Sequence, residues 1–281
     1  MKKFALFIFI ILLSANTVFA NSDTVLTDRE LIKQIKKYDK KINRNPEDAQ
    51  LYLKRGFLLF CLKDYGSAIS DFTEAEALEP NNADIYYSRG RVWHARENYE
   101  EALKDFDKAI SLNKKDSKIY ISRGITKYKL ENYYGAKADY TLAIRYNKKS
   151  QNAYANRGIT KDKLNDYKGA LEDYQKAIKL CKYAPTTYFN MGQTKYKMGL
   201  YEEAIDAFSK AIEQNPKYSM AYYKRGLVYL KLDKKQFAKS DFKMAYELNP
   251  QNEDAKNSLK KLNEDLNKLY DTTLPDWVLG E

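Results

Sequence analysis

Few side chains in this chain of 281 residues have the types and spacing that catalysis requires. His94 is the only histidine, and Cys61 and Cys181 are the only cysteines. Acid–base and nucleophilic catalysis need a base held close to a partner group. The sequence offers no glycine-rich phosphate loop and no cluster of metal ligands. We therefore predict no catalytic residue, no cofactor, no metal site and no enzymatic activity, and we expect His94 to line a surface or to pack.

The chain that carries these three residues is organised as an internal repeat of 34 residues. Glycine recurs at this interval without an insertion, at Gly56, Gly90, Gly124, Gly158, Gly192 and Gly226. A tyrosine precedes each glycine by four residues, at Tyr52, Tyr86, Tyr120, Tyr154, Tyr188 and Tyr222. An alanine follows twelve residues after each glycine, an aromatic residue comes four residues later, and a further alanine follows. The phased copies indicate six units of one structure.

Each unit has the apolar spacing of two amphipathic helices, expected in the first unit over about residues 49–63 and 66–78. Polar residues that can cap the first helices precede them at Asp48, Asn82, Asp116 and Ser150, whereas the fifth unit has Pro185 at the first helical position. A glycine within a helix costs about 1 kcal/mol relative to alanine. We therefore infer that the six glycines let two helices approach closely, with alanines facing them and aromatic rings beside them.

The spacing of tyrosine, glycine, alanine, aromatic residue, alanine and Asn-Pro resembles the tetratricopeptide repeat. Departures are tyrosine in place of the usual tryptophan, lysine at the closing proline of three units (Lys114, Lys148, Lys182), and Lys235 where the other units have tyrosine. The resemblance implies an all-α, right-handed solenoid of six helix-turn-helix repeats, with an N-terminal half-repeat and a C-terminal capping helix. The repeats would occupy residues 49–82, 83–116, 117–150, 151–184, 185–218 and 219–252.

The segments that flank the repeats have compositions suited to capping a solenoid. Residues 21–48 are predicted to be a linker and a capping helix, with Thr27–Ile42 resembling a lone second helix. Residues 253–270 form a predicted lysine- and glutamate-rich helix with one apolar stripe, made of Leu259, Leu262, Leu266 and Leu269. The tail at residues 271–281 contains Trp277, so we expect it to dock on the repeats.

Residues 1–20 read as a secretory signal peptide: Lys2 and Lys3 come first, an apolar run follows from Phe4 to Leu13, and cleavage is expected after Ala20. This predicts a periplasmic or secreted protein. The alternative is a membrane anchor formed by residues 4–20, which is short for a membrane span. The net charge of +11 would raise nucleic acid as a partner in the cytosol, but export argues against it.

An arginine precedes the glycine in five units and an aspartate follows that arginine by sixteen residues, at Arg55/Asp71, Arg89/Asp105, Arg123/Asp139, Arg157/Asp173 and Arg225/Asp241. The fifth unit has Met191 and Ala207 instead, so both charges are lost together. This predicts an ion pair between the two helices of one unit, in preference to an arginine ladder for an acidic ligand.

The two cysteines lie about three repeats apart, which is too far for a disulfide. We expect each to be a small buried apolar residue.

In the tetratricopeptide family the first helices line a concave surface. Projection of these helices away from the glycines nominates Phe57, Arg91, Ile125, Ile159, Gln193 and Leu227, with Lys54, Tyr87, Ile121, Asn156, Asn190 and Tyr223 nearby. A further row holds Phe60, His94, Tyr128, Asp162, Tyr196 and Leu230, beside Lys129, Lys163, Lys197 and Lys231. We expect a partner peptide with carboxylates and hydrophobic anchors. The lysines could equally form an ordinary solvated face.

The sequence therefore favours an interaction scaffold that holds another protein or a peptide outside the cytoplasm. Two alternatives stay open: an envelope-assembly factor anchored in a membrane, and a binder of an anionic polymer through the basic surface, which would show steep salt dependence. The identity of the partner and the oligomeric state are left undetermined.

Overall fold

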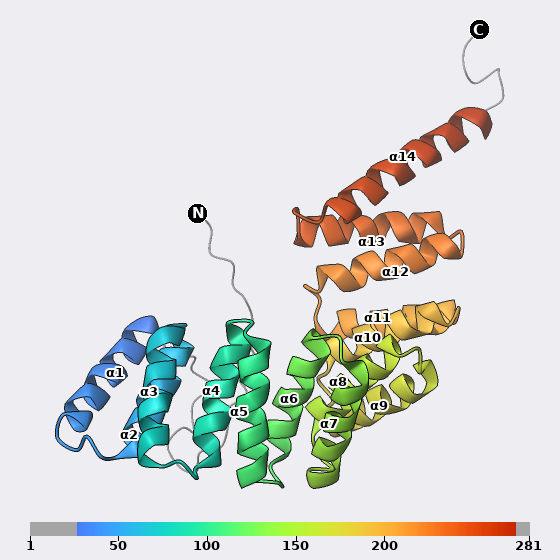
Figure 1. Cartoon of the computed structure of the whole chain (residues 1–281). Helices are drawn as coiled ribbons and strands as arrows, with labels where there is room; N and C mark the ends of the chain where they lie inside the picture. Colours follow the sequence, from blue (N-terminus) through green and yellow to red (C-terminus); the bar gives the residue numbers. More distant parts are fainter. Residues whose placement is uncertain (1–26, 274–281) are drawn as a thin grey trace.

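The computed structural model describes the backbone of residues 27–273 and the side chains of residues 27–264. This part of the chain consists of fourteen helices and no strand, arranged as a curved row of helical hairpins (Figure 1). The predicted all-α solenoid is confirmed. The predicted signal segment and Trp277 lie outside the described residues. The helices are α1 Asp28–Ile42, α2 Ala49–Cys61, α3 Tyr65–Leu78, α4 Ala83–Ala95, α5 Tyr99–Leu112, α6 Ser117–Lys129, α7 Tyr133–Tyr146, α8 Gln151–Lys163, α9 Tyr167–Leu180, α10 Pro185–Lys197, α11 Tyr201–Gln214, α12 Ser219–Lys231, α13 Lys235–Leu248 and α14 Glu253–Thr273.

Local sequence sets where the helices begin and end. The predicted caps are confirmed, because the side chains of Asp48, Asn82, Asp116 and Ser150 accept hydrogen bonds from first-turn backbone N–H groups. Pro185 occupies the first turn of α10, as expected. The first helix of each unit ends before a residue with positive φ, which turns the chain into the second helix: Lys63, Glu97, Glu131, Asn165, Gly199 and Asp233. This turn is why α2 ends at Cys61 and not near residue 63.

The glycines lie at the contact between the two helices of a unit. A Cβ atom added to Gly56 would lie 2.8 Å from a ring carbon of Phe72, and the other five glycines meet their own aromatic ring equally closely. The first alanine column is fully buried, at Ala68, Ala102, Ala136, Ala170, Ala204 and Ala238. The predicted close approach is confirmed, with one refinement: the aromatic ring itself covers the glycine.

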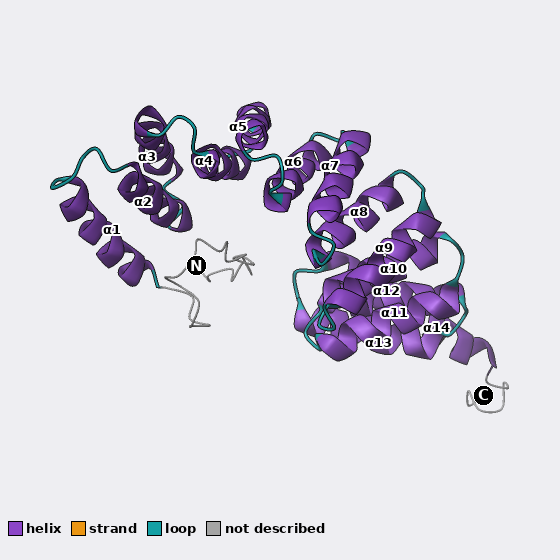
Figure 2. Ribbon diagram, turned by 90° about the horizontal axis from the view of Figure 1, so that it is seen from below, coloured by secondary structure: helices purple, strands orange, loops and turns teal. Residues whose placement is uncertain are grey.

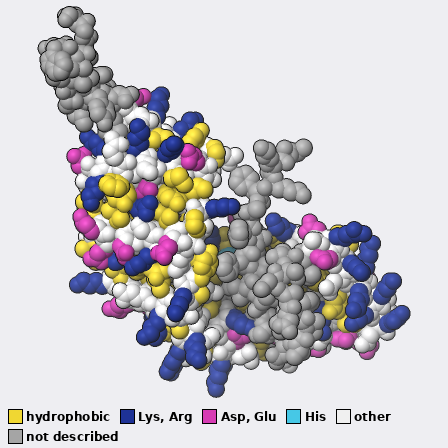
Figure 3. All heavy atoms as spheres, turned by 180° about the vertical axis from the view of Figure 1, so that it is seen from behind, with side chains coloured by type: hydrophobic (Ala, Val, Ile, Leu, Met, Phe, Trp, Pro, Cys, Tyr) yellow, Lys and Arg dark blue, Asp and Glu magenta, His cyan; other side chains and the backbone are white. Residues whose placement is uncertain are grey.

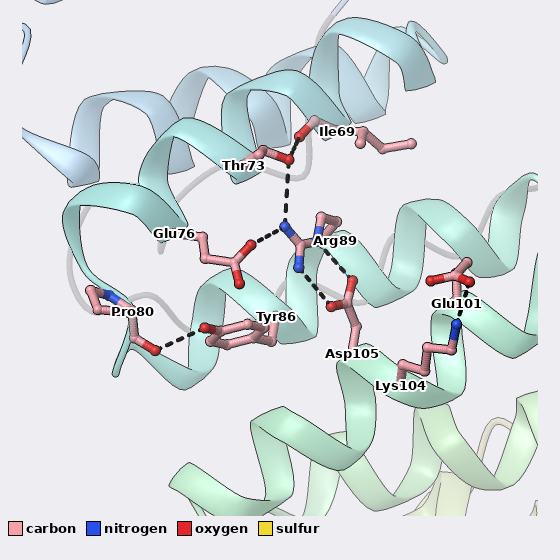
Figure 4. Close-up of polar contacts among 9 residues, drawn as sticks. All are labelled: Ile69, Thr73, Glu76, Pro80, Tyr86, Arg89, Glu101, Lys104 and Asp105. Atoms are coloured by element: carbon pink, nitrogen blue, oxygen red, sulfur yellow. Dashed lines mark hydrogen bonds and ion pairs between the residues drawn. The ribbon is translucent and has the colours of Figure 1, made fainter.

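The arginine of each charged unit joins three helices (Figure 4). In the second unit, Arg89 Nε and Nη2 donate to the two carboxylate oxygens of Asp105 at 2.9 Å each. Arg89 Nη1 turns the other way, to Glu76 and Thr73 of the preceding unit. The guanidinium also lies 5.7 Å from the ring centre of Tyr86. The tyrosine column thus has a role in the five charged units, because each of their rings supports a charged arginine.

The same arrangement recurs in the other charged units, with bidentate Arg–Asp distances of 2.6–2.9 Å. The predicted ion pair is confirmed. In addition, each Nη1 contacts the residue sixteen positions before its arginine, namely Asp39, Thr73, Asp107, Thr141 or Ser209. In the fifth unit, Met191 and Ala207 are buried in an apolar cluster with Ala170 and Tyr174.

The curvature follows from unequal contacts between neighbouring units. Each first helix touches the next first helix along the row, from α2 to α12, whereas no two consecutive second helices of the described residues make a comparable contact. The first helices therefore lie on the inside of the curve. Figure 2 shows this for the N-terminal half, where α2, α4 and α6 lie inside α3, α5 and α7.

A single helix covers each end of the row. A capping box starts α1 at Thr27, and Leu31 and Ile42 bury its inner side against the first unit. At the other end, Leu262 of α14 is buried and Leu259 packs beside it near Phe242. These two leucines of the predicted stripe thus face the repeats.

The expectation that both cysteines are buried is wrong. Cys61 is half-buried and Cys181 is exposed, and both are free thiols. Cys181 ends α9 as its C-cap, in the loop that leads to the next unit, and there its Sγ donates to the carbonyl of Tyr183 at 3.3 Å. Burial raises the pKa of the Cys61 thiol.

Candidate partner-binding surface

The inside of the curve carries one row of partly exposed side chains, placed one residue after each glycine. The glycine faces the second helix, and the next residue lies about 100° further around the first helix, away from that contact. All six members of this row are half-buried: Phe57, Arg91, Ile125, Ile159, Gln193 and Leu227. We refer to the exposed and half-buried faces of α2, α4, α6, α8, α10 and α12 as the inner surface. Its central row is mostly apolar.

The flanking positions nominated from the sequence differ in accessibility. Tyr87 is 7% exposed, and its ring packs 6.2 Å from that of Phe106, so it belongs to the core. Its hydroxyl lies 3.4 Å from Ser122 Oγ, and burial raises its pKa. By contrast, Lys54 is exposed, and Ile121, Asn156, Asn190 and Tyr223 are half-buried. At the second unit this position therefore offers no side chain for contact with a partner.

Aromatic pairs close the ends of the hairpins on this surface. In four units, the ring at the last turn of the first helix contacts a tyrosine at the start of the second helix. The pairs are Phe60/Tyr65, His94/Tyr99, Tyr128/Tyr133 and Tyr196/Tyr201, with ring centres 5.2–6.0 Å apart. These packed ring pairs lie where each first helix turns into the second helix of its unit.

The fourth unit replaces this ring with a carboxylate. Asp162 on α8 accepts a hydrogen bond of 2.7 Å from Thr194 Oγ1 on α10 and forms an ion pair with Lys197. Lys197 Nζ also lies 5.9 Å from the ring centre of Tyr167. The side chain of Asp162 is only 12% exposed. These contacts link the fourth unit to the fifth, and we call Asp162, Tyr167, Thr194 and Lys197 the Asp162 cluster.

His94 is engaged in packing, which agrees with the expectation that it lines a surface or packs. Its Nδ1 lies 2.9 Å from Oγ1 of the buried Thr126, whose hydroxyl in turn donates to the Ser122 carbonyl. With the threonine proton used in that way, Nδ1 is the donor to Thr126. Burial lowers the pKa of His94, and the charge of Lys129 lowers it further.

The lysine row lies along one side of the inner surface. Lys129, Lys163 and Lys231 are exposed, and within the described residues none has an ion-pair partner. Lys197 is the exception, because Asp162 already neutralises it. A second positive element lies near the N-terminal end, where the Arg91 guanidinium stacks 5.2 Å from the centre of the Phe60 ring. The inner surface thus combines apolar side chains with accessible cations.

Several contacts were not anticipated from the sequence. Lys127 and Lys161 form ion pairs of 2.9 Å with Asp139 and Asp173, which supports the central Arg–Asp pairs. The position two residues after the glycine is buried in every unit. Units one, two and six have an apolar residue there (Leu58, Val92 and Val228), whereas units three to five have a threonine (Thr126, Thr160 and Thr194). The sequence did contain a signal for these threonine contacts, because a polar residue at a position that is apolar in the other units indicates a polar contact.

Within residues 27–264, His, Cys, Asp and Glu side chains do not gather in any group of three that could bind a metal. Among the helices described, none combines the length and the apolar character needed to cross a membrane.

Comparison with known proteins identifies the repeat. A family model described as tetratricopeptide repeat matches residues 83–116 and 185–218, and a second model with the same description matches residues 207–239. A third model, described as TPR repeat, matches residues 163–199. No curated protein matches the sequence. A tetratricopeptide repeat protein from Parabacteroides merdae is 21% identical, with 83% of this chain and 93% of that chain covered and a TM-score of 0.64.

Two further solved structures share the fold at low identity. PilF of Pseudomonas aeruginosa is 15% identical, with a TM-score of 0.66 over 79% of this chain and 99% of that chain. A chain of the APC/C hetero-tetramer Cut9–Hcn1 is 19% identical with a TM-score of 0.68. The alignment covers 83% of this chain and spans 46% of the Cut9–Hcn1 chain. The matched regions show that this chain contains tetratricopeptide repeats, and the solved structures share its solenoid fold.

Proposed function

We propose that this chain is a non-enzymatic scaffold that binds an extended peptide or protein segment along its inner surface. The observation that supports this most directly is the row of half-buried, mostly apolar side chains that begins at Phe57 and ends at Leu227. Covering apolar surface is favourable by roughly 25 cal/mol per Å². The packed helices already hold these side chains in place, so little side-chain ordering is needed when a partner binds.

The charges suggest which partner the inner surface selects. Lys129, Lys163 and Lys231 are accessible at the C-terminal ends of α6, α8 and α12. A peptide that places carboxylates toward these lysines and apolar side chains toward Ile125 and Ile159 would satisfy both rows. Purely electrostatic binding of a polymer would instead ignore the apolar row.

We also propose that the chain acts outside the cytoplasm. Lys2, Lys3 and the apolar run from Phe4 to Leu13 support this. Fractionation of cells and sequencing of the N-terminus of the mature protein test it. A soluble protein that begins after Ala20 indicates a cleaved signal, recovery in the membrane fraction with residues 1–20 intact indicates an anchor, and recovery in the cytosol contradicts export.

Site-specific photo-crosslinking in intact cells tests the binding role. A photoreactive benzoyl-phenylalanine at Gln193 reports on the inner surface, and the same residue at Tyr134, which is 73% exposed on α7, is the matched outer control. We expect a discrete crosslinked partner from position 193 and not from position 134. Equal crosslinking at both positions would contradict binding along the inner surface.

A salt titration separates the scaffold from the polymer binder. Binding of the captured partner should weaken by less than tenfold between about 50 and 200 mM salt, since a protein that neutralises many phosphates loses roughly 10³–10⁵ over this range. A steeper loss, matched by binding of heparin, would favour the anionic polymer.

A further inference from the structure

The outer face of α1 carries a cluster of positive charge that the repeats do not require. Arg29, Ile32, Lys33, Lys36, Lys37 and Lys40 line one open depression on this helix. Their spacing of three and four residues places them on one face. Figure 3 shows Lys and Arg side chains along the end of the molecule where α1 lies, at the right of the view. We call these six residues the α1 patch.

The α1 patch has a single sign of charge. Asp28 and Glu30 belong to the first turn of the helix, where Glu30 completes the capping box, and Asp39 is paired with Arg55. The five cations of the α1 patch are exposed, and within the described residues none has an ion-pair partner. Apart from the attraction between Lys33 and Glu30, their charge is therefore available to a partner.

Capping alone does not explain this composition. A terminal helix needs an outer face that water can solvate, and mixed charges provide that. The helix at the opposite end shows it, because α14 begins with exposed Glu253 and Asp254 and pairs Lys256 with Glu253. Mutual repulsion makes five like charges on one short helix a less favourable choice for solubility alone.

We propose that the α1 patch is a docking surface for an anionic lipid membrane. From Arg29 to Lys40 the face extends over roughly 16 Å along the helix axis, which suits an array of headgroups better than one small ligand. Ile32, 45% exposed, lies among the cations. A basic helical face with an apolar side chain at its surface is the arrangement that binds lipid headgroups and inserts beneath them.

The position of α1 in the chain agrees with this surface. The apolar segment predicted to be an export signal or an anchor ends at Ala20, eight residues before α1 begins. Eight residues reach at most about 29 Å. A membrane that holds residues 4–20 would therefore lie within reach of the α1 patch, with the inner surface left free to bind a partner.

Vesicle binding by the full chain tests the proposal. The probes are phosphatidylcholine vesicles with and without phosphatidylglycerol, and the variant replaces the five cations of the α1 patch with Gln. The matched control removes the same charge from five other exposed lysines, at Lys115, Lys149, Lys168, Lys176 and Lys179. Each basic residue at an anionic surface strengthens binding roughly fivefold. We expect the patch variant to lose at least about a hundredfold in affinity for anionic vesicles, and the control less than about tenfold. Equal losses would overturn the proposal.

A second measurement distinguishes lipid from other polyanions. In Ile32→Trp, the new indole should shift its emission to the blue on anionic vesicles, relative to the wild-type spectrum, and should not shift with an oligothymidylate. Binding of both probes without a shift on vesicles would assign the patch to nucleic acid and refute membrane docking. Crosslinking from position 193 in the patch variant reports separately on the scaffold function, so the two proposals can fail independently.

Discussion

A methyl group at Gly56 tests whether each unit depends on the contact between glycine and ring. The new Cβ would lie 2.8 Å from Cε1 of Phe72 and 3.1 Å from Cδ1 and Cζ, whereas carbon atoms prefer about 3.5–4.0 Å. Phe72 has no exposed surface, so its ring can yield only by displacing packed neighbours. We expect Gly56→Ala to lose about 1–3 kcal/mol through overpacking, offset by up to about 1 kcal/mol of helix propensity.

Gly66 provides the matched control within the same hairpin. It lies in the first turn of α3, and nothing is within 4 Å of the position of its Cβ. Gly66→Ala should therefore stabilise the protein slightly, by up to about 1 kcal/mol. Urea unfolding followed by far-UV circular dichroism gives the difference in unfolding free energy between the two variants. If Gly56→Ala proves as stable as Gly66→Ala, the glycine column does not serve close packing.

Three further predictions concern charged groups. Asp139→Ala leaves Arg123 and Lys127 without their shared carboxylate and should destabilise the fold by about 3–5 kcal/mol, while an unchanged melting temperature would mean that the pair contributes nothing. Because the pKa of His94 is lowered, its contribution to stability is present above the unfolded pKa of about 6.5 and is lost as the pH falls toward the folded value. His94→Gln should reduce the loss of unfolding free energy between about pH 7.5 and 5.5, and equal losses would contradict this. Asp162→Asn frees Lys197 and should tighten binding of a fluorescent acidic peptide about fivefold by anisotropy, whereas weaker binding would show that Asp162 itself contacts the ligand.

Comparison among the six copies predicted the fold because each copy needs a glycine where its two helices meet and an aromatic ring that covers it. The joint loss of charge at Met191 and Ala207 was enough to assign the Arg–Asp pair to one unit. The third bond of each arginine was not predictable in the same way. Its partners are Asp39 in one unit and Thr141 in another, so no single residue type marks the position.

Accessibility on the inner surface was the part that spacing could not supply. Tyr87 and Tyr223 occupy the same position in different units, yet Tyr87 is buried and Tyr223 is half-buried. The neighbouring side chains decide this, and they differ between units. The contact of Asp162 with Lys197 occurs in one unit alone, so the repeat gave no second copy from which to recognise it.

The fourth and fifth units meet at a junction of a different kind. At each of the other four junctions between repeats, an arginine contacts the second helix of the preceding unit. At the junction of the fourth and fifth units, Met191 packs against Ala170 and Tyr174 instead. Apolar packing is non-directional, whereas a bidentate arginine fixes geometry. On its inner side, the same junction is held by the Asp162 cluster, which joins α8 to α10.

The Asp162 cluster and the junction without an arginine lie between the same two units. This arrangement links binding of a ligand on the inner surface to the curvature of the solenoid. A ligand carboxylate that draws Lys197 away from Asp162 would compete with a contact that orients the fifth unit on the fourth. No arginine would then constrain that junction, because position 191 is methionine. The inner surface should therefore adjust its curvature at this point more readily than elsewhere, and an acidic partner that spans Lys163 and Lys197 is the one able to exploit it.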